Sequence, residues 1–133
     1  MTHRLTRTLA ILAVTIAAAA VGAQTMPATT QSDFQVKTTG DLVRLCEAKP
    51  ADTTGIAALH FCEGFAVGAY QYYQIVIMAE AKRPLVCPPT PPPTRDEAIA
   101  SFLRWARQNP QAMSTPPAEG LFESLAQRYP CRA

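Results

Sequence analysis

The sequence predicts an all-α fold, a small four-helix bundle with two disulfides that follows a cleaved signal peptide. Three observations predict it. Apolar residues recur at helical spacing in several segments, and the chain without its leader has the ordinary length of one domain. Four cysteines follow the leader, namely Cys46, Cys62, Cys87 and Cys131. In an exported protein, such an even set indicates two disulfides.

The first 23 residues have the pattern of a secretory signal peptide. Arg4 and Arg7 precede an uncharged run from Leu9 to Val21, and small residues at Val21-Gly22-Ala23 suit signal peptidase, so we expect cleavage after Ala23. The alternative is an uncleaved membrane anchor, but a run of about 13 residues falls short of the roughly 20 that span a bilayer. A leader followed by paired cysteines indicates the periplasm.

Charge argues against several classes of partner. The full chain has 12 Lys and Arg against 10 Asp and Glu, and loss of Arg4 and Arg7 with the leader makes the two signs equal. A nucleic-acid-binding protein usually shows a basic excess on one face, and none is evident here. The sequence has no polybasic stretch for anionic lipid and no second membrane-spanning run, so we expect no membrane contact after cleavage.

The sequence offers no catalytic set, and we expect neither an enzyme nor a cofactor. His60 is the one histidine left after cleavage, which excludes a multi-histidine metal site, and oxidised cysteines supply no thiolate ligands. We expect His60 to be a partly buried structural side chain. Asp96 and Glu97 could suggest acid–base chemistry, but they fall in the first turn of a predicted helix, where they complement its dipole.

Residues 24–37 are rich in Thr, Gln, Ser and Ala and are predicted to be flexible, although Phe34 could dock on the domain formed by residues 38–133. A short helix is predicted over residues 41–48, capped by Thr39 or Asp41. Residues 49–55, with Pro50 and Gly55, form a loop.

A long helix is predicted over residues 57–81, and it is apolar around most of its circumference. Such a helix is usually the one on which the others pack. Gly64 and Gly68 are four residues apart, which predicts close packing of a neighbouring helix within the fold. We expect Tyr72 and Tyr73 in the core, on two adjacent apolar stripes whose members are Phe61, Phe65, Gly68, Tyr72, Ile75 and Ala79, then Cys62, Ala66, Ala69, Tyr73 and Val76.

A proline-rich connector separates this helix from two more. Residues 88–93 hold five prolines, so we expect a stiff polyproline II segment. Thr94 and Glu97 have capping-box spacing and start a third helix, which Asn109-Pro110 ends. Thr115, with Pro116 at the first helical position, opens the last helix, whose inner side comprises Ala118, Leu121, Phe122, Leu125 and Tyr129.

Helix geometry selects one of the three possible cysteine pairings. Cys62 lies near the start of the long helix and Cys87 beyond its end, so about 20 helical residues separate them by roughly 30 Å. A disulfide needs Cα atoms about 5 to 6 Å apart, which excludes that pair. If short links make successive helices antiparallel, Cys87 meets Cys131 at one end of the bundle, and Cys46 pairs with Cys62 at the other.

The chain resembles the Rap/Tai family of immunity proteins, small exported helical proteins encoded with toxins of the type VI secretion system. The resemblance spans most of residues 38–133. It rests on Thr39 to Ala48, Cys62 to Gly68, Cys87-Pro88-Pro89, Phe102-Leu103 to Asn109-Pro110, and Leu121 to Cys131. Four cysteines in matching contexts and order make it specific, whereas the proline run after Cys87 departs from the family pattern.

The resemblance implies a periplasmic inhibitor that binds a peptidoglycan-cleaving amidase effector and blocks its active site. It also implies that relatives act as dimers, with a helix and a loop entering the toxin's cleft, so we expect a cognate effector as partner and a possible homodimer. Exposed candidates for partner binding on the third helix and the following turn are Arg104, Trp105, Arg107, Gln108, Asn109 and Gln111. Trp and Arg are common interface anchors, but Trp105 could instead pack beside Phe102.

A second class of function is open at this stage. A periplasmic acid-stress chaperone would also be small, helical and disulfide-bonded, and it would expose apolar surface by partial unfolding at low pH. An enzyme is a remote third possibility. Dye binding on acidification would separate the chaperone from the inhibitor.

Overall fold

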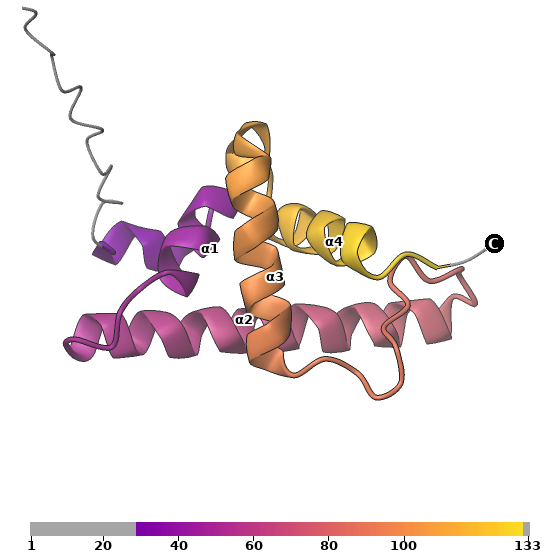
Figure 1. Ribbon diagram of the computed structural model, residues 1–133. Coiled ribbons are helices and arrows are strands. Elements are labelled where there is room, and N and C mark those ends of the chain that lie inside the picture. The colour runs from indigo at the N-terminus through magenta and orange to yellow at the C-terminus, as the bar shows by residue number, and fades with distance from the viewer. Residues whose placement is uncertain (1–28, 132–133) are drawn as a thin grey trace, which may run out of the picture.

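The computed structural model describes residues 29–131, which form only helices and connecting segments (Figure 1). The predicted all-α fold is confirmed. The elements are η1 (Gln31–Gln35), α1 (Thr39–Cys46), α2 (Thr53–Ala79), α3 (Arg95–Gln108), η2 (Pro110–Ser114) and α4 (Pro117–Arg128). The predicted signal peptide, residues 1–23, lies outside the described residues, as do residues 24–28.

Side-chain caps set the starts of the helices. The α1 cap is Thr38, one residue before the expected Thr39, and Asp41 completes a capping box by accepting from the Thr38 backbone N–H. In α3 the predicted capping box of Thr94 and Glu97 is present, with both reciprocal hydrogen bonds formed. Helix α4 begins one residue later than expected, because Pro117 and not Pro116 occupies its first position. Local capping chemistry therefore positioned the start of α3 correctly and that of α4 to within one residue, whereas α1 begins at Thr39, two residues before its predicted start at residue 41.

Helix α2 starts earlier than its apolar pattern predicted. The Asp52 side chain accepts a hydrogen bond from the Gly55 N–H at 2.8 Å and so caps a helix that begins at Thr53. Gly55 is buried, and a Cβ there would overlap the carbonyl oxygen of Lys49. The loop from residue 49 thus folds directly back onto the first turn of α2, which requires glycine at this position.

Both predicted disulfides are confirmed. Cys46 pairs with Cys62, with Cα atoms 5.1 Å apart, and Cys87 pairs with Cys131 at 4.9 Å. The first bond joins the end of α1 to the first third of α2. The second joins the connector after α2 to the residue that follows α4.

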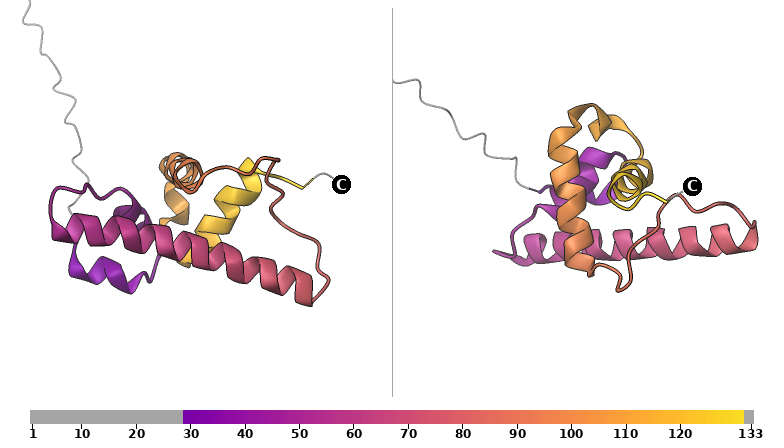
Figure 2. Two further views of the ribbon diagram at one scale, coloured as in Figure 1. Left: turned by 90° about the horizontal axis from the view of Figure 1, so that it is seen from below. Right: turned by 45° about the vertical axis from the view of Figure 1, so that its right-hand side comes forward.

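The helices are not arranged as the expected antiparallel bundle. Helix α3 crosses α2, and α1, α3 and α4 gather on one side of the α2 rod (Figures 1 and 2). The reason is the connector, residues 80–94, which is long enough to lead the chain from the far end of α2 back to its middle. There Arg95 Nη1, at the start of α3, lies 3.5 Å from Glu63 Oε2 of α2.

The core lies between α1, α3 and α4 and includes only the first third of α2. Its fully buried members include Leu42 and Leu45 of α1 and Phe102 of α3. From α2 only Gly55, Ala58 and Cys62 are buried. The prediction that the others pack around α2 was therefore wrong for most of its length. Within residues 29–131, no helix combines the length and apolar character needed to cross a membrane.

Residues 31–35, expected to be flexible, form the ordered 3-10 helix η1. Asp33 is 3% exposed, and its carboxylate accepts from Arg44 Nε at 2.6 Å and from the Thr30 N–H at 2.7 Å. Phe34 docks as predicted and meets the Phe61 ring edge-on, with centroids 5.7 Å apart. A buried charge and an aromatic contact together hold this segment against α1 and α2.

Candidate partner-binding surface

The last turn of α3 and η2 form the end of the molecule farthest from α2, at the top of Figure 1. The candidate residues gathered there, which we call the apex, are Arg104, Arg107, Gln108, Asn109 and Gln111. Asn109 is half-buried and the other four are exposed. Five of the six predicted partner-binding residues therefore lie in the last two turns of α3, at Asn109 or in η2, and none of the five is buried.

The sixth predicted residue, Trp105, is not exposed. It is buried, 8% exposed, and its ring stacks with that of Phe102 at a centroid distance of 6.3 Å. The helical wheel placed Trp105 outside because it shows only one helix, whereas α1 and η2 also close over this side of α3. Trp105 is therefore a core residue that supports the apex, and the expectation of an exposed anchor is corrected.

Glu47 is a member of this surface that the sequence did not reveal. Arg107 Nη2 donates to Glu47 Oε1 at 2.9 Å, linking α3 to the end of α1. The Glu47 side chain is only 15% exposed, and its Oε2 is buried with no hydrogen-bond partner among residues 29–131. Because the two residues are 60 positions apart, no local motif could have paired them.

The backbone of η2 is anchored to α1 and α4. Thr39 is fully buried; its N–H donates to the Thr115 carbonyl at 2.8 Å, and its hydroxyl lies within 3.1 Å of the Pro116 carbonyl. A Cβ at Gly120 would collide with the Thr39 side chain, and one at Gly40 would come within 3.1 Å of the Met113 carbonyl. Close approach at two glycines therefore fixes η2 relative to the core.

Hydrogen bonds within the apex order its turn. Asn109 Nδ2 donates to the Trp105 carbonyl at 2.8 Å, and Gln111 Nε2 donates to Asn109 Oδ1 at 3.2 Å. Asn109 thereby closes the C-terminal end of α3 before Pro110 starts η2. A rigid turn loses little entropy on binding, which suits a surface that recognises a partner.

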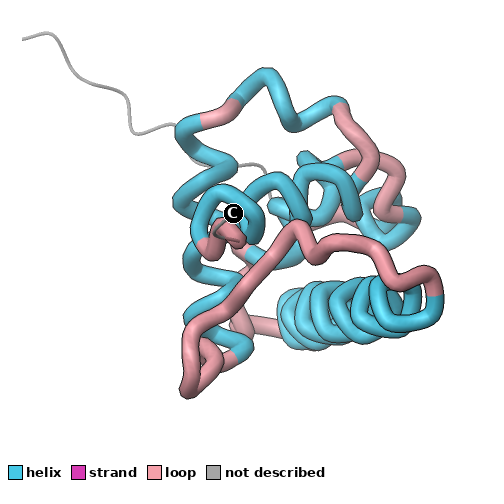
Figure 3. The backbone as a smooth tube through the Cα atoms, turned by 90° about the vertical axis from the view of Figure 1, so that its right-hand side faces the viewer, coloured by secondary structure: helices cyan, strands magenta, loops and turns pink. Residues whose placement is uncertain are grey.

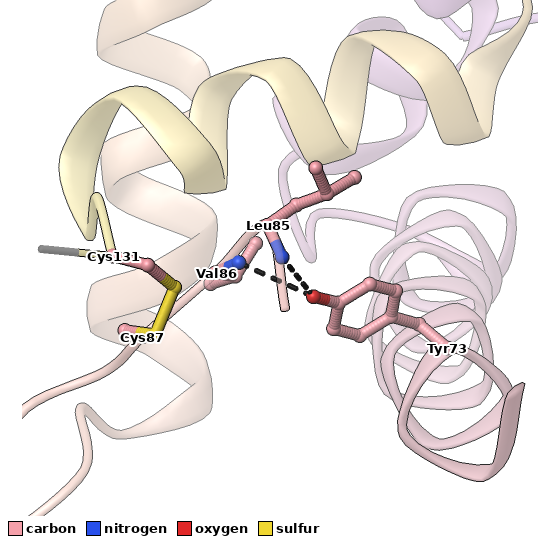
Figure 4. The surroundings of a disulfide bond; sticks show 5 residues. All are labelled: Tyr73, Leu85, Val86, Cys87 and Cys131. Carbon is pink, nitrogen blue, oxygen red and sulfur yellow. Dashed lines mark hydrogen bonds between the residues drawn. A yellow bond between two sulfur atoms is a disulfide. The ribbon is translucent and has the colours of Figure 1, made fainter. Parts of the chain in front are cut away.

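The opposite end of the molecule is held by Tyr73 and the second disulfide (Figure 4). The backbone N–H groups of Leu85 and Val86 both donate to the Tyr73 hydroxyl oxygen, and the Cys87 N–H donates to the Tyr129 carbonyl at 2.8 Å. The connector is otherwise irregular and includes a cis Thr90–Pro91 peptide, which differs from the expected polyproline II segment.

A cavity of about 350 Å³ lies beneath this connector, between α2, α3 and α4. Its apolar lining includes Pro92, Ile99 and Leu125, and Tyr70 also faces it. Burial, together with the neighbouring Tyr73, raises the pKa of the Tyr70 phenol above its ordinary value. This phenol is therefore neutral at physiological pH.

Metal and acid–base candidates do not cluster in the described part of the chain. Among residues 29–131, no group of three or more His, Cys, Asp or Glu side chains is placed to hold a metal ion. His60, expected to be partly buried, has a side chain that is 74% exposed and lies 3.6 Å from Glu63 Oε2. Asp96 and Glu97 stand in the first turn of α3, where the Thr94 hydrogen bonds lower the pKa of Glu97.

The structure defines a small helical protein closed by two disulfides. A family model described as "Rap1a immunity proteins" matches residues 38–131. The match covers more than half of the chain, so the protein belongs to the Rap1a immunity protein family, which confirms the resemblance found in the sequence. Immunity proteins of this kind act against secreted effectors, and the family is not known as enzymatic. The comparisons with curated proteins and with solved structures gave no match.

Proposed function

We propose that this protein is a periplasmic immunity protein that binds a peptidoglycan-cleaving amidase, delivered by type VI secretion, and blocks its active site. The observation that carries the proposal is the family match over residues 38–131. The cognate effector is the partner, and the chain binds it as a homodimer, as the resemblance implies. The catalytic residues then belong to the effector, and this chain contributes a binding surface of complementary shape and charge.

The disulfides support the periplasmic assignment. All four cysteines are paired, and such bonds persist in oxidising compartments such as the bacterial periplasm. The predicted signal peptide over residues 1–23 agrees with this. Peptidoglycan lies in the same compartment, so an inhibitor located there would meet an amidase where the amidase acts.

The apex is the proposed contact with the effector. Arg104 and Arg107 offer guanidinium donors, which suit carboxylate or carbonyl groups around an active-site cleft. Gln108 and Gln111 add amide groups on both sides of the turn. Because Thr39 and Asn109 fix the backbone beneath them, these side chains project from a frame that needs no rearrangement on binding.

The experiment is an inhibition assay with residues 24–133, both disulfides formed, and the amidase encoded beside this protein's gene. The proposal predicts that about one equivalent abolishes release of peptide from purified peptidoglycan. Arg104→Glu combined with Gln111→Ala should restore hydrolysis, whereas the same two changes at exposed positions outside the apex, Arg83→Glu with Gln127→Ala, should still inhibit. Full hydrolysis at excess wild-type protein would refute the proposal.

One structural feature favours the second candidate function, an acid-stress chaperone. Helix α2 exposes large apolar side chains, among them Met78 at 75%, which could hold unfolded clients. A chaperone would bind a polarity-sensitive dye strongly on acidification and suppress aggregation of a denatured client. An immunity protein would inhibit its effector at neutral pH without either behaviour.

A further inference from the structure

The packing around α2 loosens after its first third. A Cβ at Gly64 or Gly68 would meet nothing within 4 Å, so the close helix packing predicted for these glycines within the fold is absent. The connector, residues 80–94, crosses from the end of α2 to the start of α3 (Figure 3). Beneath it lies the cavity of about 350 Å³, which we call the connector cavity. Ordinary packing leaves few voids larger than one water molecule, so this volume is exceptional for a small domain.

The connector is held in place on both sides of the connector cavity. On one side the Tyr73 hydroxyl accepts from the Val86 N–H, next to the second disulfide. On the other side Thr94 and Glu97 close the capping box of α3. The prolines of the connector that line the cavity are Pro88, Pro92 and Pro93. Because their rings fix φ, this segment resists collapse onto the helices and keeps the cavity open.

The floor of the connector cavity is apolar. Leu121 and Leu125 of α4 and Val86 of the connector are buried there, and Ile99 of α3 is half-buried beside them. Such a surface favours a ligand with an apolar body, because binding removes apolar area from water. The volume suits about a dozen non-hydrogen atoms, at the roughly 30 Å³ that one water molecule occupies in the liquid.

The rim of the connector cavity carries a positive charge. Arg95, the first residue of α3, is the one charged side chain among the described residues that line the cavity, and it is 54% exposed. The N-terminal end of α3 adds the partial positive charge of its helix dipole at the same place. From α2, the protonated phenol of Tyr70 supplies a hydrogen-bond donor. The rim therefore complements an anion.

Three acidic residues are neighbours of Arg95 in space or in sequence, and none of them lines the connector cavity. Glu63 Oε2 lies 3.5 Å from Arg95 Nη1, and a guanidinium has further N–H groups for a second anion. The Glu97 carboxylate accepts from the N–H and hydroxyl of Thr94 at the helix cap. Asp96 is exposed. The charge that a ligand in the cavity meets is therefore that of Arg95.

We propose that the connector cavity binds a small carboxylic acid with an apolar body. The carboxylate lies at Arg95 and the N-terminal end of α3, and the hydrocarbon covers Leu121 and Leu125. A free acid is favoured over a phospholipid, because two acyl chains exceed a volume of about a dozen atoms. The apex is at the other end of α3, about 21 Å along a helix of 14 residues, so this site is separate from the proposed contact with the effector.

Decanoate is the probe, since it has about a dozen non-hydrogen atoms and one carboxylate. Calorimetric titration of residues 24–133, with both disulfides formed, should give one site with a Kd on the order of 100 µM. Decanol has the same chain without the charge and should bind at least about fivefold more weakly. Vesicles of phosphatidylglycerol, a second source of acyl chains, should not retain the protein. Retention by the vesicles with no response to decanoate would overturn the proposal.

Two variants test the location of the site. Arg95→Gln should weaken decanoate binding at least about fivefold and leave decanol binding unchanged. The matched control is Arg104→Gln, the same change at the apex, which should bind like wild type. Ala98→Phe places a ring in the connector cavity and should abolish binding of both probes, whereas Ala57→Phe at an exposed position of α2 should not. Circular dichroism verifies that each variant is folded, and Arg95→Gln decides if Ala98→Phe is not.

Backbone amide shifts in two-dimensional NMR spectra locate the ligand independently. Decanoate should shift the amides of Ala98, Ile99 and Leu125, which surround the connector cavity. Shifts confined to Ile75 and Met78, which are exposed on α2, would show adsorption to apolar surface and overturn the proposal. Decanoate binding that Arg95→Gln leaves unchanged, or no binding at millimolar decanoate, would equally overturn it. No effector is present in these assays, so their failure is distinguishable from a failure to inhibit.

Discussion

The hydroxyl oxygen of Tyr73 accepts a hydrogen bond from the backbone N–H of Val86 at 3.2 Å, across thirteen residues of sequence. Val86 is 4% exposed and directly precedes Cys87 of the second disulfide. The same oxygen accepts from the Leu85 N–H, and the Tyr73 ring packs on Phe122 with centroids 4.8 Å apart. One side chain therefore joins α2, the connector and α4 (Figure 4).

Removing this hydroxyl should destabilise the domain. Tyr73→Phe keeps the ring contact with Phe122 but leaves the buried Val86 N–H without an acceptor, which costs about 1–3 kcal/mol. Urea denaturation at neutral pH measures the change in the free energy of unfolding. The matched control is Tyr72→Phe, whose 69% exposed side chain should lose its hydroxyl at no cost. Equal stability of the two variants would contradict the structural role of Tyr73.

Protonation of Asp33 should lower the free energy of unfolding at acidic pH. Burial acts to raise the pKa of this carboxyl, but hydrogen bonds from Thr30 and Arg44 outweigh it, and the net pKa lies below the ordinary value of 3.8. A group with a lowered folded-state pKa contributes stability above its unfolded-state pKa and loses it as pH falls through the folded-state pKa. The loss should therefore occur below about pH 4.

Asp33→Asn tests this contribution. The variant should be less stable than wild type at pH 7, and the difference should shrink as pH falls below about 4, because the wild-type carboxyl then becomes neutral as well. Urea midpoints between pH 7 and about pH 2.5 measure it. A difference that does not depend on pH would show that the carboxylate charge contributes nothing.

The two disulfides should stabilise the protein to different degrees. Cys46–Cys62 closes a separation of 16 residues and Cys87–Cys131 one of 44. Chain-entropy arguments give about 3 kcal/mol for the shorter loop and about 4 kcal/mol for the longer. Replacing each pair by alanines and measuring urea unfolding gives the stability that each disulfide contributes. Removal of Cys46–Cys62 also removes a buried side chain from the core, since Cys62 is 1% exposed, so its measured loss of stability should exceed the chain-entropy value. A Cys87→Ala, Cys131→Ala variant as stable as wild type would contradict the stabilising role of the second disulfide.

Glu47 should position Arg107 for binding rather than stabilise the fold. Arg107 is 65% exposed, so the ion pair adds under about 1 kcal/mol, and Glu47→Gln should change the urea midpoint little. The same variant frees the guanidinium to sample other rotamers, and we expect several-fold weaker effector binding by isothermal titration calorimetry. Arg107→Ala should weaken binding at least as much. Unchanged affinity in both variants would remove Arg107 from the proposed interface.

Alanine in place of the exposed Gly64 of α2 should stabilise the chain. Gly64→Ala places a methyl group where nothing lies within 4 Å, and alanine is favoured over glycine in a helix by roughly 1 kcal/mol. The midpoint of urea unfolding should therefore rise. Gly120→Ala is the opposite case, since its Cβ would collide with Thr39, and it should destabilise the chain. Destabilisation by Gly64→Ala would show that this position is not open.

Local chemistry made much of the fold predictable. The Thr94 and Glu97 spacing identified the start of α3 correctly, and the length of α2 excluded a Cys62–Cys87 bond, which removes one of the three possible pairings. These inferences depend on hydrogen bonds between residues close in sequence or on the rise of a helix per residue, and both can be worked out from the sequence. The choice between the two remaining pairings assumed an antiparallel bundle, and the observed disulfides form although that arrangement is absent.

Tertiary packing determined what the sequence could not predict. Helix α2 is apolar on several sides, and only the placement of α1, α3 and α4 decides that Cys62 is buried while Tyr72 is exposed. Trp105 is buried for the same reason. At the apex, the sequence found Arg107 but not Glu47, because a pairing over 60 residues leaves no periodic signal.

Inhibition is measured most directly as the rate of peptidoglycan hydrolysis by the adjacent-gene amidase, titrated with residues 24–133. We expect a linear fall in rate that reaches zero near one equivalent of this protein per amidase. A rate unchanged at tenfold excess, with both disulfides verified as formed, would contradict it.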